Sequence, residues 1–80
     1  MPYIHKEMRK IVDMTMVADN AGELNYLITT LIIDYHLRKG GNYQAINDVV
    51  GALEGAKFEF YRRVAAPYED LKIKQNGDVY

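Results

Sequence analysis

Cysteine and serine are both absent from this 80-residue chain. The lack of cysteine excludes disulfides, thiol catalysis and cysteine-based zinc sites, and the lack of serine excludes serine hydrolase chemistry. Only two prolines and six glycines accompany 49% hydrophobic residues, which is the composition of a folding chain and not of a disordered or collagen-like one. Because so short a chain seldom carries two hydrophobic cores, we expect a single helical domain over residues 1–80.

An excess of either charge is also missing, since ten basic and eleven acidic residues leave a formal net charge of -1. We therefore expect no binding to duplex nucleic acid and no binding to membranes, and any anion site must be local. No apolar run, Leu31–Ile33 included, is long enough to span a membrane, and the N-terminus lacks a signal-peptide core. These features predict a cytoplasmic protein.

Apolar residues recur at three- and four-residue steps in three stretches, and this spacing predicts an all-α fold of three helices. We expect the first helix at about 4–18. The second helix begins after Asn20, which forms a capping box with Glu23, and it runs to about Lys39. It stops at Gly40–Gly41, where a left-handed residue can close the last turn.

The third helix is expected to start at Asn42 as its N-cap. Its apolar stripe is the strongest periodic signal in the chain and consists of Ile46, Val49, Val50, Leu53, Ala56, Phe60 and Val64. Pro67 either kinks this helix or ends it near Ala65 and starts a further helical turn. Residues 73–80, with a turn at Asn76–Gly77, form either a short hairpin or a disordered or partner-bound tail.

The second helix is apolar on two faces. One stripe consists of Leu24, Leu27, Ile28, Leu31, Ile32 and Tyr35, and roughly opposite to it lie Tyr26, Ile33 and Leu37. Three short helices can cover one of these faces, so we expect the second to be buried by another subunit. The sequence thus predicts an obligate homo-oligomer with Tyr26, Ile33 and Leu37 at the subunit contact, where Val79 and Tyr80 of the tail also dock.

Two glycines four residues apart, Gly51 and Gly55, lie inside the third helix, where each costs about 1 kcal/mol relative to alanine. At 100° per residue they share a face with Asn47, Phe58 and Arg62. An aromatic ring can stack on a base, a guanidinium can hold a phosphate and an amide can read a base or ribose edge. This face is therefore a candidate nucleotide site, and the alternative is close packing of another helix across the glycines.

Basic residues at Lys57, Arg62 and Arg63, together with Tyr61, extend this candidate site. Lys57 falls within the apolar stripe, so it needs a partner. That partner is either an anionic ligand or one of the acidic residues Asp34, Glu54 and Glu59.

The sequence contains no recognisable catalytic or metal-site motif. His5 and His36 have no histidine at metal-ligand spacing, and the adjacent Glu69 and Asp70 project differently from a helix. We expect no enzymatic activity, no metal and no cofactor.

Six blocks of sequence carry a family resemblance: Met1–Ile4, Ala21–Thr29, Tyr43–Glu54, Glu59–Arg63, Ala66–Asp70 and Asn76–Tyr80. They resemble a family of small uncharacterised proteins from phages, prophages and gut bacteria, and the stretch from Lys6 to Asp19 matches least well. The family carries no enzymatic assignment, so the resemblance implies a setting and no mechanism. Because phages use many small oligomeric proteins against host immunity, it also suggests by analogy a sponge that sequesters a nucleotide second messenger.

Two main functions remain open from the sequence. The first is a non-catalytic homo-oligomer in the host cytoplasm that sequesters a cyclic oligonucleotide or an ADP-ribose derivative. The alternative is a structural or regulatory helical interaction module with no small-molecule ligand. A minor nucleotide hydrolase that uses Glu59, Glu69 or Asp70 is the weakest hypothesis, since no nucleophile–base pair is legible.

Overall fold

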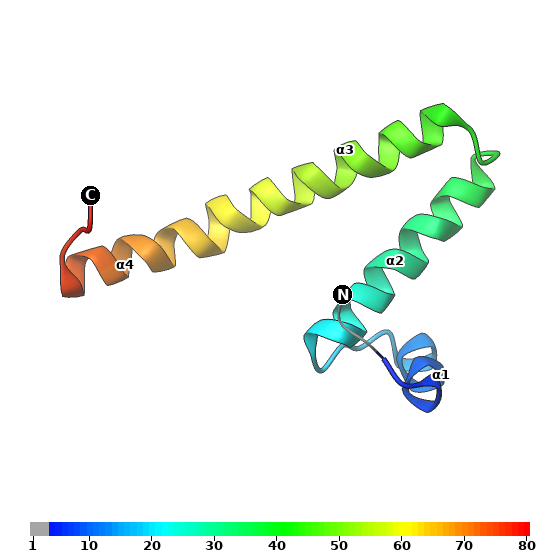
Figure 1. The fold of residues 1–80 in the computed structure, drawn as a ribbon, viewed down its shortest axis with the longest axis horizontal. Coiled ribbons are helices and arrows are strands. Elements are labelled where there is room, and N and C mark those ends of the chain that lie inside the picture. The colour runs from blue at the N-terminus through cyan, green and yellow to red at the C-terminus, as the bar shows by residue number, and fades with distance from the viewer. Residues whose placement is uncertain (1–3) are drawn as a thin grey trace. The chain divides into compact units, whose positions relative to one another are not determined.

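A computed structural model describes residues 4–80 of the chain, and all of its regular elements are helical (Figure 1). In chain order they are α1 (Lys6–Thr15), α2 (Ala21–Arg38), α3 (Tyr43–Phe60), the π-helical turn η1 (Tyr61–Ala65) and α4 (Ala66–Asn76). No strand occurs within these described residues, so the predicted all-α class is confirmed. Contacts divide the chain into two units, Met1–Ile46 and Asn47–Tyr80, and the prediction of a single domain stays a prediction.

In the first unit, α1 ends three residues earlier than the expected 4–18. The Thr15 hydroxyl donates to the Ile11 carbonyl at 2.9 Å and accepts the Val17 N–H at 3.3 Å. Met16 adopts the left-handed conformation (φ 58°), and its N–H donates to the Val12 carbonyl at 2.8 Å. These bonds satisfy the last carbonyls of the helix and turn the chain away, so the apolar pattern beyond Thr15 does not continue it.

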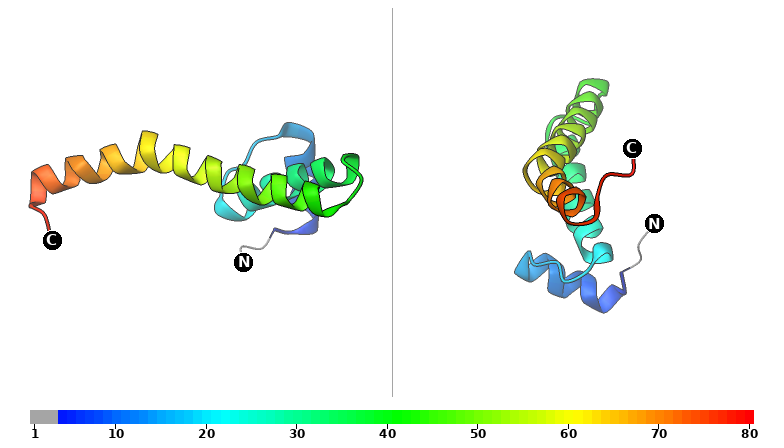
Figure 2. Two further views of the ribbon diagram at one scale, coloured as in Figure 1. Left: turned by 90° about the horizontal axis from the view of Figure 1, so that it is seen from above. Right: turned by 90° about the vertical axis from the view of Figure 1, so that its left-hand side faces the viewer.

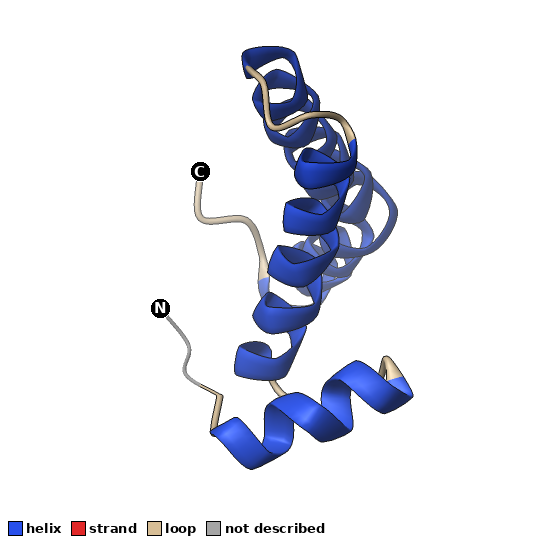
Figure 3. Ribbon diagram, turned by 90° about the vertical axis from the view of Figure 1, so that its right-hand side faces the viewer, coloured by secondary structure: helices blue, strands red, loops and turns tan. Residues whose placement is uncertain are grey.

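The α1 helix lies across the N-terminal end of α2 (Figure 3). Val12 is the buried residue of α1, with 1% of its surface exposed, and Gly22 and Glu23 are buried in α2. The Tyr26 hydroxyl of α2 donates to Asp13 Oδ2 of α1 at 2.8 Å. This hydrogen bond ties the two helices together.

The N-terminus of α2 carries the predicted capping box. Asn20 Oδ1 accepts the Glu23 N–H at 2.9 Å, and Asn20 Nδ2 donates to Glu23 Oε2 at 2.9 Å. The other carboxylate oxygen of Glu23 accepts the Asp19 N–H at 3.1 Å. These bonds account for the burial of Glu23, a charged side chain with only 4% exposed surface.

The stop after α2 and the start of α3 also match the prediction. Gly40 and Gly41 have positive φ angles of 95° and 63°. Their N–H groups donate to the carbonyls of Leu37 and His36, which closes the last turn of α2. Asn42 then caps α3 by accepting the Ala45 N–H at 2.9 Å.

The second unit is helical from Asn47 to Asn76, and the ribbon passes through η1 into α4 without a break (Figure 2). Proline at position 67 lacks an N–H, so the Arg63 carbonyl cannot make its usual bond to the fourth residue along. The helix adjusts with a π turn, in which the Ala66 N–H donates to the Tyr61 carbonyl five residues back. Pro67 thus neither ends the helix near Ala65 nor forces a new start.

Of the two alternatives for residues 73–80, the hairpin is wrong, because 73–76 belong to α4. Gly77 has a φ of 83°, and its N–H donates to the Ile73 carbonyl at 2.7 Å. A glycine with positive φ ends a helix as readily as it forms a hairpin turn, and the flanking segments are too short for independent strands. Residues 77–80 form a tail without regular secondary structure.

Candidate functional site

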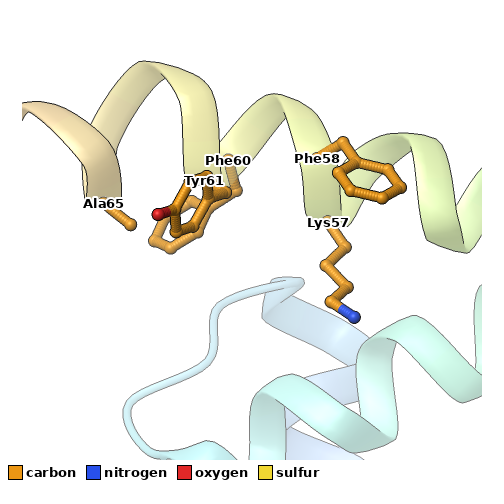
Figure 4. Close-up of a pocket in the computed structure, with 5 residues that line it drawn as sticks. All are labelled: Lys57, Phe58, Phe60, Tyr61 and Ala65. Carbon is orange, nitrogen blue, oxygen red and sulfur yellow. The ribbon is translucent and has the colours of Figure 1, made fainter.

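A hollow on the second unit is a candidate binding site. It has a volume of about 390 Å³ and is lined by Lys57, Phe58, Phe60, Tyr61 and Ala65 (Figure 4). These residues come from the last turn of α3 and from η1. The hollow is a shelf along one helix and not an enclosed pocket, because Phe58, Phe60 and Tyr61 are each at least half exposed.

Ordinary helical spacing accounts for the lining of this hollow. Lys57, Tyr61 and Ala65 follow one another at four-residue steps, which place them on one side of the helix. Ala65 lines the hollow next to Tyr61, and its methyl group leaves the ring accessible. An aromatic surface of this kind can stack on a planar ligand or accept an apolar side chain of a protein.

Charges around the hollow are largely paired within the helix. Lys57 Nζ lies 4.0 Å from Glu54 Oε1, and Arg63 Nε donates to Glu59 Oε2 at 2.8 Å. Of the partners expected for Lys57, the structure thus shows Glu54. All four side chains are more than half exposed, so each ion pair adds little stability and leaves its cation able to change partner.

The hydroxyl of Tyr61 donates to Glu69 Oε2 at 3.2 Å. The negative charge of Glu69, and then this hydrogen bond, raise the pKa of Tyr61 above its ordinary value of 10.0. Tyr61 is therefore neutral at physiological pH, where it offers a ring face and no negative charge.

Arg62 makes no ion pair or hydrogen bond with any residue between 4 and 80. It lies one turn from Phe58 on the same helical face, but it does not line the hollow. A planar guanidinium without a carboxylate partner can take a phosphate or a carboxylate in two parallel hydrogen bonds.

The structure brings together three of the predicted ligand-binding residues in this hollow, namely Lys57, Phe58 and Tyr61. The other five predicted residues lie outside it: Asn47, Gly51, Gly55, Arg62 and Arg63. No atom comes within 4 Å of a methyl group built on Gly51 or on Gly55. Within the described chain, then, these glycines pack against no other helix, and their face is open to solvent.

Sequence reasoning missed Phe60 and Ala65 as parts of the hollow. Phe60 belongs to the apolar stripe predicted for the third helix. Ala65 lies four residues after Tyr61, so helical spacing places it on the same side, and this spacing was the signal that could have found it.

The predicted interface residues fall into two groups. Ile33 and Leu37 are exposed on α2, and Val79 and Tyr80 are exposed in the tail. Tyr26 instead contacts α1 through its bond to Asp13. Whether any of these residues meets another subunit stays a prediction.

The described residues contain no group of three or more histidine, aspartate or glutamate side chains that could hold a metal ion. No described helix is both long enough and apolar enough to cross a membrane.

Comparison with protein families matches residues 1–79 to DUF6899, a domain of unknown function. The chain belongs to this family. Searches of curated proteins and of solved structures returned no match. Membership in the DUF6899 family agrees with the resemblance to an uncharacterised family and assigns no activity.

Proposed function

We propose that the protein is a non-catalytic helical interaction module that acts as a homo-oligomer. The observation that supports it is the second unit, a single helix whose apolar stripe is uncovered. Phe60 is 64% exposed and Val64 is 53% exposed, and no residue in 47–80 is buried. A lone helix is only marginally stable in water, since most helical stability in proteins comes from packing of an apolar face.

Exposed side chains in the first unit support the same proposal. Ile33 and Leu37 on α2 are 53% and 68% exposed, and Leu24, Ile28 and Leu31 of the opposite stripe are exposed as well. Covering one large apolar side chain contributes about 1.5–3 kcal/mol, so a partner that covers several gains enough to offset the cost of association. Both units therefore present surfaces suited to a protein partner.

Sedimentation equilibrium over a range of micromolar concentrations tests this proposal. We expect the full chain to sediment as a dimer or a larger closed assembly, with helical content that falls on dilution. A monomer that keeps its helical content throughout would overturn it.

A nucleotide ligand is the second candidate function, and the unpaired Arg62 beside the aromatic hollow favours it. Phe58 or Tyr61 would stack on the base, Arg62 would hold a phosphate, and Lys57 and Arg63 would exchange their carboxylate partners for it. In this form the protein would be a phage-encoded sponge in the host cytoplasm that sequesters a cyclic oligonucleotide or an ADP-ribose derivative.

Isothermal titration calorimetry with a panel of cyclic di- and trinucleotides and ADP-ribose tests this second candidate. Arg62→Ala should cost about 1.5–3 kcal/mol of binding, the range for a hydrogen bond to a charged group. Arg62→Lys should restore only part of the loss, because an ammonium lacks the planar fork. A Kd no lower than about 1 mM for every nucleotide, measured on the folded protein, would overturn this second candidate function.

A further inference from the structure

We infer that two copies of the chain pair antiparallel along one line of the third helix, which we name the seam. The seam consists of Ile46, Val50, Leu53, Lys57, Phe60 and Val64. This inference rests on the proposed homo-oligomer, and it specifies the surface, the occupant and the orientation.

The seam has the spacing of a coiled coil. Its members are separated by alternating steps of four and three residues, the pattern that keeps side chains facing a partner helix along its length. Figure 4 shows Lys57 and Phe60 projecting from the same side of the helix. The seam ends at Val64, which lies inside the π turn η1, because the wider turn shifts the residues after it around the axis by about one position.

The area available suits a second copy of the same helix. The seam side chains are exposed by between 38% at Leu53 and 64% at Phe60 among its apolar members. A second copy laid along the seam covers all six of these side chains on each helix, and a specific interface needs about 1,000 Å² in total. The contact is self-complementary, as a two-fold symmetric dimer requires.

The charge of the helix also suits a copy of itself better than a strongly acidic or basic partner. From position 47 to position 76, acidic and basic side chains balance: Asp48, Glu54, Glu59, Glu69 and Asp70 against Lys57, Arg62, Arg63, Lys72 and Lys74. A neutral helix with both signs interspersed meets no net repulsion from an identical helix.

Lys57 decides the orientation. In a parallel pair in register, the two Lys57 ammonium groups would face each other inside the apolar seam, where like charges are costly. The seam residues alternate between the two apolar positions of the heptad repeat, a and d. In an antiparallel pair, each a position faces a d position of the partner helix, so Lys57 faces Leu53 of the second copy. Glu54, which already lies 4.0 Å from Lys57 in its own chain, then comes beside the Lys57 of the second copy too.

In one antiparallel register, every seam residue faces a seam residue of the second copy. It places Ile46 against Val64, Val50 against Phe60, and Leu53 against Lys57 of the second copy. Shifting the helices by one heptad leaves seam residues at the ends without a partner or moves them beyond the π turn. The register is therefore set by the length of the seam.

Disulfide cross-linking tests the inference cleanly, because the chain contains no cysteine. Ile46→Cys and Val64→Cys are prepared as separate full-length proteins, refolded alone and as an equal mixture, and then oxidised. We expect the mixture to yield the mixed 46–64 disulfide by intact mass, and each variant alone to yield almost no cross-linked dimer. In the antiparallel pair, two copies of either position lie about 27 Å apart at 1.5 Å per residue, far beyond the about 7 Å that a disulfide allows.

Two further variants complete the test. Gly55→Cys, whose side chain meets no atom within 4 Å and points away from the seam, should not cross-link and controls for random collisions. Lys57→Leu removes the like-charge penalty, so in that background Val64→Cys alone should begin to form its own cross-linked dimer.

The outcomes separate the two proposals. Cross-linking of each variant with itself in the presence of Lys57 would show a parallel pair and overturn this inference while the homo-oligomer stands. A dimer in sedimentation that forms no seam disulfide would overturn it too, since another surface would then hold the copies together. A monomer would overturn the proposed homo-oligomer together with this inference.

Discussion

Replacing Asn20 by alanine is expected to lower the free energy of unfolding by about 2 kcal/mol, more than is usual for a single helix cap. The reason is that Asn20 does two things in the capping box. Its Oδ1 accepts the Glu23 N–H, and its Nδ2 donates to the Glu23 carboxylate, each at 2.9 Å. The substitution removes both bonds at once.

The magnitude follows from comparison with Asn42, which caps α3 without a glutamate to reciprocate. Asn42 accepts the Ala45 N–H at 2.9 Å, and its Nδ2 makes only a long contact of 3.4 Å to the Lys39 carbonyl. Loss of such a cap typically costs about 1 kcal/mol. Asn20→Ala loses a similar cap and also one of the donors to the buried Glu23 carboxylate, for which about a further 1 kcal/mol is reasonable because the Asp19 N–H remains.

Urea denaturation followed by circular dichroism measures both variants, at one fixed protein concentration because assembly affects apparent stability. Glu23→Ala and the double variant complete a mutant cycle, in which the coupling between Asn20 and Glu23 should be positive and near 1 kcal/mol. If Asn42→Ala costs as much as Asn20→Ala, or if the cycle shows no coupling, the reasoning from the capping box is refuted.

Three more predictions concern assembly and pH. Ile33→Glu, which places a charge on the exposed face of α2, should weaken any subunit contact there; light scattering that reports an unchanged assembly would remove this face from the interface. Hydrogen bonding to Asp13 raises the pKa of Tyr26 above 10.0. The bond therefore contributes fully to stability below pH 10, and this contribution is lost as pH rises through the raised pKa. Tyr26→Phe should abolish this loss of stability at alkaline pH. Deleting 77–80, the exposed tail with Val79 and Tyr80, should reduce assembly, whereas unchanged sedimentation would show a passive tail.

The sequence by itself determined where the chain turns. Asn20, Glu23, Gly40–Gly41 and Asn42 act on backbone groups within a few residues of themselves, so their side-chain types were enough to locate the ends of α2 and the start of α3. Local hydrogen bonds of this kind depend little on what packs against the helix. For the same reason the all-α class followed from the spacing of apolar residues.

The sequence did not determine the structure of segments for which more than one local conformation was possible. Pro67 signalled a disturbed helix, but only the structure decided that a π turn absorbs it. Asn76–Gly77 was interpreted as a hairpin turn or as part of a tail, and only the structure shows that α4 continues as far as Asn76. Thr15 ended α1 early through bonds that the apolar pattern does not encode.

The candidate site shows the same division. Periodicity placed Gly51, Gly55, Phe58 and Arg62 on one face, yet a shared face does not make a hollow. Only the structure shows that Phe60 and Ala65 line the hollow together with Lys57, Phe58 and Tyr61. Spacing along a helix fixes the direction in which a side chain projects. The depth of a hollow and what covers it depend on how the backbone and its neighbours pack, which only the tertiary structure decides.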